Sequence, residues 1–200
     1  MIRLAMVGLG KIARVHTAAW EQMHEIELVA GVDVGDIDSW KFRGTSIPVY
    51  RTVEELVSHE PDYVVVATPT GTHYQVTLKI LNTLDSKVLV EKPLASTIEH
   101  TKELLDPDRE SGEIDRLVVL YHAAYAPEVQ WAAGNLRRWL DEIGTVVSFD
   151  SFFSDALMED FDSAARAYES SWLDSGINCL TVLARLVSLK EIIAFRRIAG

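Results

Sequence analysis

Two glycines near the start of the chain have the spacing of a nucleotide phosphate site. The segment 8–13 reads G-x-G-x-x-A and follows a short apolar run at 2–7, which has the pattern of a strand buried on both faces. In such a turn the first glycine permits a tight bend, the second lets the backbone approach a pyrophosphate, and the small third residue lets a helix lie close to the strand. The anion would bind at the helix N-terminus. The candidate cofactor-binding residues here are Gly8, Gly10, Lys11, Ile12 and Ala13.

An acidic residue ends the next apolar run. Asp33 follows the segment 28–32 and lies 23 residues after Gly10. Its carboxylate can accept hydrogen bonds from the adenosine ribose and repels a 2′-phosphate, which favours NAD over NADP. Asp33 could also simply end a strand, and Lys41 and Arg43 leave NADP open.

Polar residues follow two further expected strands. The β-branched run 63–68 leads into a Thr-Pro-Thr turn, and the run 87–91 ends at a Lys-Pro pair. Because ligands of open α/β sheets bind along the carboxyl edge of the strands, we expect these turns to line the same site as the glycines. A lone histidine after a strand more often packs than binds. The candidate cofactor-binding residues in these turns are Thr68, Pro69, Thr70, His73, Glu91 and Lys92.

Expected strands alternate with expected helices over residues 1–121, which predicts right-handed βαβ units and an α/β fold with a doubly wound parallel sheet. Thr52-x-x-Glu55 and Ser96-x-x-Glu99 have the pattern of capping boxes at helix starts. The segment 39–48 reads as a loop.

The pattern changes in residues 122–200. Two strands with one covered face are not normally self-sufficient, so this part is expected to form an incomplete α+β second domain. The elements expected there are a helix over 127–140, a strand over 145–153, a loop over 158–168, a helix over 173–187 and a strand over 191–198.

Composition argues against several classes of protein. A net charge of −11 disfavours nucleic acid and anionic membranes as partners. A single cysteine, Cys179, excludes an intrachain disulfide and fits a reducing compartment. The N-terminus lacks the pattern of a signal peptide, no apolar run has the length of a membrane span, and no histidines have metal-ligand spacing. We therefore expect a cytoplasmic protein without a catalytic metal.

Four segments in order resemble one known family. GLGKIA at 8–13, ATP at 67–69, VEKPLA at 90–95 and LDSGIN at 173–178 look like segments of the glucose-fructose oxidoreductase/inositol dehydrogenase/MocA (Gfo/Idh/MocA) family. The resemblance implies an N-terminal Rossmann domain that binds NAD or NADP, a second domain with a large open sheet, and homo-oligomers. Because residues 122–200 offer only two candidate strands for that sheet, the resemblance implies a fragment or a truncated relative. It also implies an oxidoreductase, since most members are dehydrogenases of sugars, polyols or their derivatives.

The same resemblance implies a catalytic set. The family uses the lysine of E-K-P, here Lys92, with an aspartate and a histidine spaced D-x-x-x-H, here Asp174 and Asn178. The asparagine departs from the pattern and, with the segment 121–127, is similar to aldose 1-dehydrogenases acting on L-arabinose or D-galactose. Without the family pattern, Asp174 would be read as a helix cap, Asn178 as a solvated residue and Lys92 as a turn lysine. The implied substrate-binding residues are Lys92, His122, Trp172, Asp174 and Asn178.

The anomeric hydroxyl of a sugar offers a chemical reason for the asparagine. It is a hemiacetal and more acidic than a ring hydroxyl, so Asp174 or Lys92 could take its proton while Asn178 orients it. The product would be an aldonolactone. Two rivals stay open: another polyol or sugar-derivative dehydrogenase of the family, and a nucleotide-binding module without catalysis.

Overall fold

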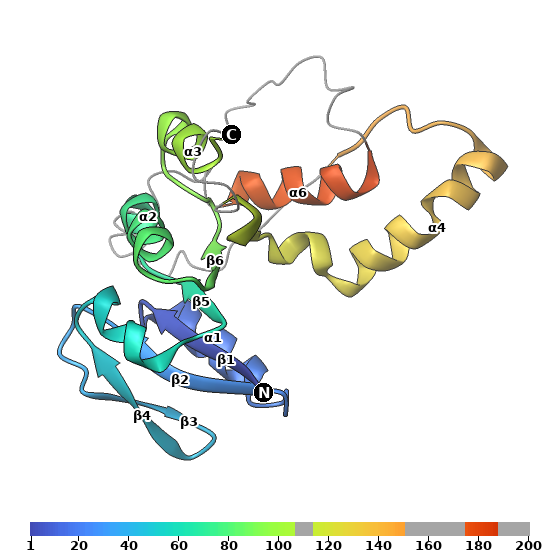
Figure 1. Ribbon diagram of the computed structural model, residues 1–200. Coiled ribbons are helices and arrows are strands. Elements are labelled where there is room, and N and C mark those ends of the chain that lie inside the picture. The colour runs from blue at the N-terminus through green and yellow to red at the C-terminus, as the bar shows by residue number, and fades with distance from the viewer. Residues whose placement is uncertain (107–113, 151–174, 188–200) are drawn as a thin grey trace. The chain divides into compact units, whose positions relative to one another are not determined.

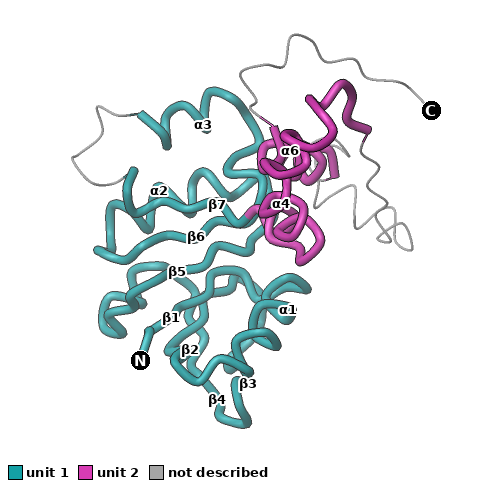
Figure 2. Tube along the Cα trace, turned by 90° about the vertical axis from the view of Figure 1, so that its right-hand side faces the viewer, with its two compact units in different colours: residues 1–120, 165–169 teal, residues 121–164, 170–200 magenta. Residues whose placement is uncertain are grey.

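The computed structural model describes residues 1–106, 114–150 and 175–187. The chain divides into two compact units, residues 1–120 with 165–169 and residues 121–164 with 170–200 (Figure 2). Every described strand belongs to the first unit, whereas the regular elements described in the second unit are helical.

A seven-stranded sheet forms the first unit, in the order β3-β4-β2-β1-β5-β6-β7. Six strands are parallel, and the edge strand β3 runs antiparallel to β4. The order reverses between β1 and β5, and ligands of such sheets bind at the carboxyl edge of this switch point. The predicted α/β, Rossmann-type fold is thus confirmed. The strands are β1 (Ile2–Val7), β2 (Ile26–Val32), β3 (Ser39–Phe42), β4 (Thr45–Tyr50), β5 (Tyr63–Val66), β6 (Lys87–Glu91) and β7 (Leu117–Leu120).

Helical elements cover both faces of this sheet (Figure 1). On one face Leu56, Ile80 and Leu104, which come from η1, α2 and α3, pack in a cluster with four strand valines, namely Val64 and Val66 of β5 and Val88 and Val90 of β6. On the other face Met6 of β1 packs in a cluster with Ala13 of α1. The elements are α1 (Lys11–Trp20), η1 (Val53–His59), η2 (Thr70–Thr72), α2 (His73–Thr83), α3 (Ile98–Leu104) and η3 (Ile114–Arg116).

The segment expected as a loop over 39–48 is instead the β3–β4 hairpin (Figure 1). Its turn is made by Arg43 and Gly44, which both have positive φ (49° and 76°). Two such residues form the turn that suits a right-twisted hairpin. Trp40 and Phe42 alternate with exposed residues and pack in the core, so the loop prediction was wrong because it overlooked this alternation.

The two predicted capping boxes have different outcomes. The Glu55 carboxylate accepts a hydrogen bond from the Thr52 backbone N–H at 3.0 Å, as predicted, although the helix that follows is a 3-10 helix. Helix α3 is instead capped by Thr97, whose hydroxyl accepts from the His100 N–H at 3.1 Å. The predicted cap at Ser96 was therefore one residue early.

The described elements of the second unit pack on one another. They are η4 (His122–Tyr125), α4 (Pro127–Ile143) and α6 (Ile177–Leu186), and α6 packs against both others. The Arg185 guanidinium donates to the Gln130 side-chain oxygen at 3.2 Å, which ties α6 to α4. Residues 145–150 are the described part of the strand expected over 145–153, and they do not form a strand. The described residues of this unit contain no strand with which they could pair. The segments 158–168 and 191–198 lie outside the described residues.

Candidate functional site

The first glycine of the turn after β1 is required by the fold itself. Gly8 has a φ of +89°, and a Cβ there would lie 2.7 Å from the Ala67 carbonyl oxygen. The Gly8 N–H donates to the Val32 carbonyl at 2.8 Å. The turn therefore packs directly on the end of β5, at the switch point of the sheet.

The second glycine has no such structural reason. Gly10 has an ordinary φ of −79°, and a Cβ there would meet no atom within 4 Å. It precedes α1, which has no side-chain cap and no acidic residue in its first turn. The first N–H groups of a helix lack intrahelical partners and attract anions. A bare backbone before open donors fits the pyrophosphate of a dinucleotide, and buried Ala13 lets α1 lie close to the sheet.

Asp33 ties the glycine turn to the end of β2. Its Oδ2 accepts from the Leu9 N–H and its Oδ1 from the Gly35 N–H, both at 2.7 Å. Each carboxylate oxygen has a second lone pair, so both can also accept from ribose hydroxyls. The bond to Gly35 is an Asx turn, which the Asp-x-Gly sequence signals locally. The bond to Leu9 joins two strand ends and has no local signal.

Arg43 was one of the residues for which NADP binding stayed possible, but its guanidinium makes hydrogen bonds within the fold. Its guanidinium donates to the carbonyl oxygens of Trp20, Met23 and Ile26, which lie between the last residue of α1 and the first residue of β2. Lys41 is exposed on β3. The guanidinium thus uses its donors to stabilise the C-terminal end of α1 and not to bind a 2′-phosphate.

Arg43→Met is therefore expected to lower the free energy of unfolding by about 1–3 kcal/mol, the usual range for hydrogen bonds from a charged donor. The ratio of NADH to NADPH affinity should stay unchanged. Urea denaturation and cofactor titrations measure the two effects. A selective loss of NADPH affinity at unchanged stability would contradict this role.

In the turn after β5, some side chains make hydrogen bonds within the turn and others are buried. The Thr72 hydroxyl donates to the Pro69 carbonyl oxygen at 2.7 Å and lies 2.9 Å from the Thr68 hydroxyl, from which it can accept. Thr70 and His73 are 5% and 1% exposed, whereas Pro69 is exposed. Of the side chains predicted to bind cofactor here, those of Thr68 and Pro69 are the accessible ones.

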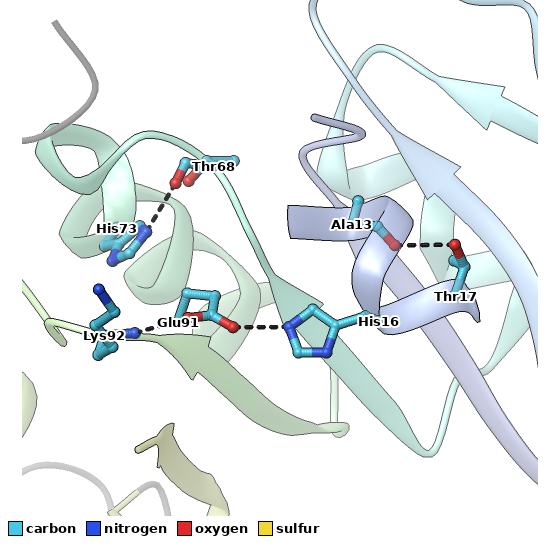
Figure 3. Close-up of polar contacts among 7 residues, drawn as sticks. All are labelled: Ala13, His16, Thr17, Thr68, His73, Glu91 and Lys92. Atoms are coloured by element: carbon cyan, nitrogen blue, oxygen red, sulfur yellow. Dashed lines mark hydrogen bonds and ion pairs between the residues drawn. The ribbon is translucent and has the colours of Figure 1, made fainter. Parts of the chain in front are cut away.

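The turn after β6 carries Lys92. The Glu91 Oε1 lies 2.7 Å from the His16 Nε2, and its Oε2 accepts from the Lys92 backbone N–H at 3.3 Å (Figure 3). Lys92 is half-buried and precedes a cis bond to Pro93. His16 lies on α1 and was not predicted as a site residue, because nothing near it in the sequence indicates its partner.

The remaining predicted residues belong to the second unit. His122 is exposed at the start of η4, and Asn178 is 2% exposed in the first turn of α6. Trp172 and Asp174 lie outside the described residues. Burial raises the pKa of Tyr121, next to His122, so its hydroxyl stays a hydrogen-bond donor to higher pH.

The described part of the chain contains neither a metal-ligand cluster nor a membrane-spanning helix. In residues 1–106, 114–150 and 175–187, no three His, Cys, Asp or Glu side chains are grouped so that they could hold a metal ion. No helix in these ranges is both long and apolar enough to cross a membrane.

Comparison with known proteins shows the family. The GFO_IDH_MocA profile, described as an oxidoreductase family with an NAD-binding Rossmann fold, matches residues 2–119. Rhizopine catabolism protein MocA from Rhizobium meliloti is 27% identical over 139 residues, covering 69% of this chain and 43% of the relative. D-glucoside 3-dehydrogenase from Escherichia coli (strain K12) is 29% identical over 133 residues, covering 64% and 37%. The chain thus spans less than half the length of these curated relatives.

A solved structure shares the fold. Scyllo-inositol dehydrogenase from Lactobacillus casei, with bound NAD(H) and scyllo-inositol, has a TM-score of 0.71 at 23% identity, covering 93% of this chain and 56% of that one. The strand order of this sheet and the family match over residues 2–119 both fit an NAD-binding Rossmann fold. The chain belongs to the Gfo/Idh/MocA family of oxidoreductases, whose N-terminal domain is an NAD-binding Rossmann fold.

Proposed function

We propose that this chain belongs to an NAD-dependent dehydrogenase that oxidises an aldose at its anomeric carbon and releases an aldonolactone. The observation that carries this proposal is the place of Lys92. It directly follows β6, on the edge of the sheet where the glycine turn and Asp33 also lie. A lysine there is well placed to meet a substrate held against a nicotinamide.

The proposed residues divide the chemistry between them. NAD, when bound, would supply the acceptor for the hydride that leaves the anomeric carbon. Lys92 or Asp174 takes the proton of the anomeric hydroxyl, and the C–O single bond becomes the lactone carbonyl, so atoms and electrons balance. Asn178 cannot act as a base, but its amide can orient that hydroxyl. Trp172 and His122 are proposed to contact the sugar.

A second candidate reaction is the oxidation of a ring hydroxyl to a ketone. The similarity to a D-glucoside 3-dehydrogenase favours it, since that protein's name places its reaction at carbon 3 of a glycoside. A third reading is a module that binds nucleotide without turnover, which an NAD-binding Rossmann fold alone would allow. Under each reading we propose a cytoplasmic homo-oligomer, on the basis of the single cysteine and of family habit.

A panel of paired substrates separates these readings. The purified protein is incubated with NAD or NADP and with free aldoses, their methyl glycosides and inositols, and reduced cofactor is followed by absorbance. Oxidation at the anomeric carbon requires turnover of free aldoses and none of methyl glycosides, whose anomeric hydroxyl is blocked. Turnover of both would establish ring oxidation instead, and tight NADH binding without any turnover would establish the module.

A further inference from the structure

His73 joins two turns of the carboxyl edge. It is 1% exposed, and its Nδ1 lies 2.7 Å from the Pro93 carbonyl oxygen, its Nε2 2.8 Å from the Thr68 carbonyl oxygen. Both partners are acceptors, so the ring must donate. A neutral imidazole donates to one of them and an imidazolium to both. His73 therefore ties the turn after β6 to the turn after β5.

His16 holds the same turn from another element. It stacks on Trp20 within α1, with ring centroids 5.4 Å apart, and meets Glu91 Oε1 at 2.7 Å. The other Glu91 oxygen accepts from the Lys92 N–H. Since Glu91 is only partly exposed, this carboxylate is shielded from water enough for its pairing to hold the turn.

We propose that His16 and His73 are positioning residues for Lys92. One acts on the residue before Lys92 through a carboxylate, and the other acts on the residue after it through a carbonyl. Figure 3 shows the two histidines approaching from different helices, α1 and the start of α2. With its neighbours fixed on both sides, the Lys92 backbone has little freedom to shift. The effect of this positioning on catalysis rests on the proposed function, whereas the positioning of Lys92 itself does not.

The geometry supplies an unusual pair of controls. The asparagine amide nitrogen mimics histidine Nδ1 and the glutamine amide nitrogen mimics Nε2, because of their distances from Cα. His73→Asn therefore keeps the bond to Pro93, whereas His73→Gln loses it. At His16, where Nε2 makes the contact, His16→Gln keeps the bond and His16→Asn loses it. The same two substitutions should have opposite effects at the two sites.

The readout is the reactivity of the Lys92 amine. Trace labelling with acetic anhydride, quantified by mass spectrometry of a Lys92 peptide, reports its surroundings without any turnover. NADH affinity and, where an aldose is turned over, kcat and KM are measured alongside. His24→Asn and His24→Gln, at an exposed histidine before β2, control for the substitutions themselves.

We expect His16→Asn and His73→Gln to raise Lys92 labelling and to lower kcat by about tenfold to a hundredfold, as a small misplacement of a reacting group does. NADH affinity should change little. His16→Gln and His73→Asn should keep the labelling of Lys92 close to that of the wild type. Equal behaviour of all four variants, or unchanged labelling in the first pair, would overturn the proposal.

The proposal stays testable if one variant does not fold or if the wild type turns over no sugar. If His73→Gln does not fold, the His16 pair decides, because that side chain is partly exposed and its loss leaves the core intact. If the wild type binds NADH but turns over no sugar, the proposed function fails while the labelling comparison still tests the bracing.

Discussion

Gly10→Ala should weaken NADH binding by roughly tenfold to a hundredfold, because the added methyl keeps the pyrophosphate away from the backbone N–H groups. This factor is the cost of losing a charge-assisted hydrogen bond to an anion. The added methyl meets no protein atom within 4 Å and the backbone φ is ordinary. The free energy of unfolding should therefore fall by less than about 1 kcal/mol. Calorimetric titration with NADH and urea denaturation measure the two quantities.

Gly8→Ala is the matched comparison. Its Cβ would lie 2.7 Å from a backbone oxygen, in a conformation with φ of +89°. We expect a loss of at least about 2 kcal/mol in stability from the strain alone. The two glycines thus separate fold from ligand. Undiminished NADH affinity in Gly10→Ala would show that no anion approaches the turn there.

Lys92→Ala should lower kcat by about a hundredfold to ten-thousandfold, the usual contribution of a group that transfers a proton. NADH affinity and melting temperature should remain near those of the wild type, because Lys92 is proposed to meet substrate. Lys102→Ala, at an exposed lysine of α3, is the control. Asp174→Asn belongs in the same series, and near-normal turnover in both Lys92→Ala and Asp174→Asn would end the proposed mechanism.

The sheet and the glycine turn were predictable because their signals are local. The β-branched run of β5 indicates a strand, and the G-x-G-x-x-A spacing indicates a phosphate-binding turn, each from a few neighbouring residues. The β3–β4 hairpin was missed because the positive φ of Arg43 is not evident from its residue type. The alternation of Trp40 and Phe42 with exposed residues was a local strand signal, and the loop prediction overlooked it.

The site residues divide in the same way. Lys92 was found because it follows a strand and matches a family motif. The bond of His16 to Glu91 spans 75 residues of sequence, and that of His73 to Pro93 spans 20. Such long-range contacts depend on how strands are ordered in the sheet. His73 was predicted to bind cofactor, whereas its described contacts are both with backbone carbonyls.

We propose that a dinucleotide lies along the carboxyl edge of this sheet, with its nicotinamide beside Lys92. Amide hydrogen exchange of the protein with and without NADH tests it most directly. We predict slower exchange in peptides covering the glycine turn, Asp33–Gly35 and the turns that contain Thr68 and Lys92. Binding that leaves these peptides unchanged, or that protects the opposite edge near Asp62 and Asp85, would contradict the account.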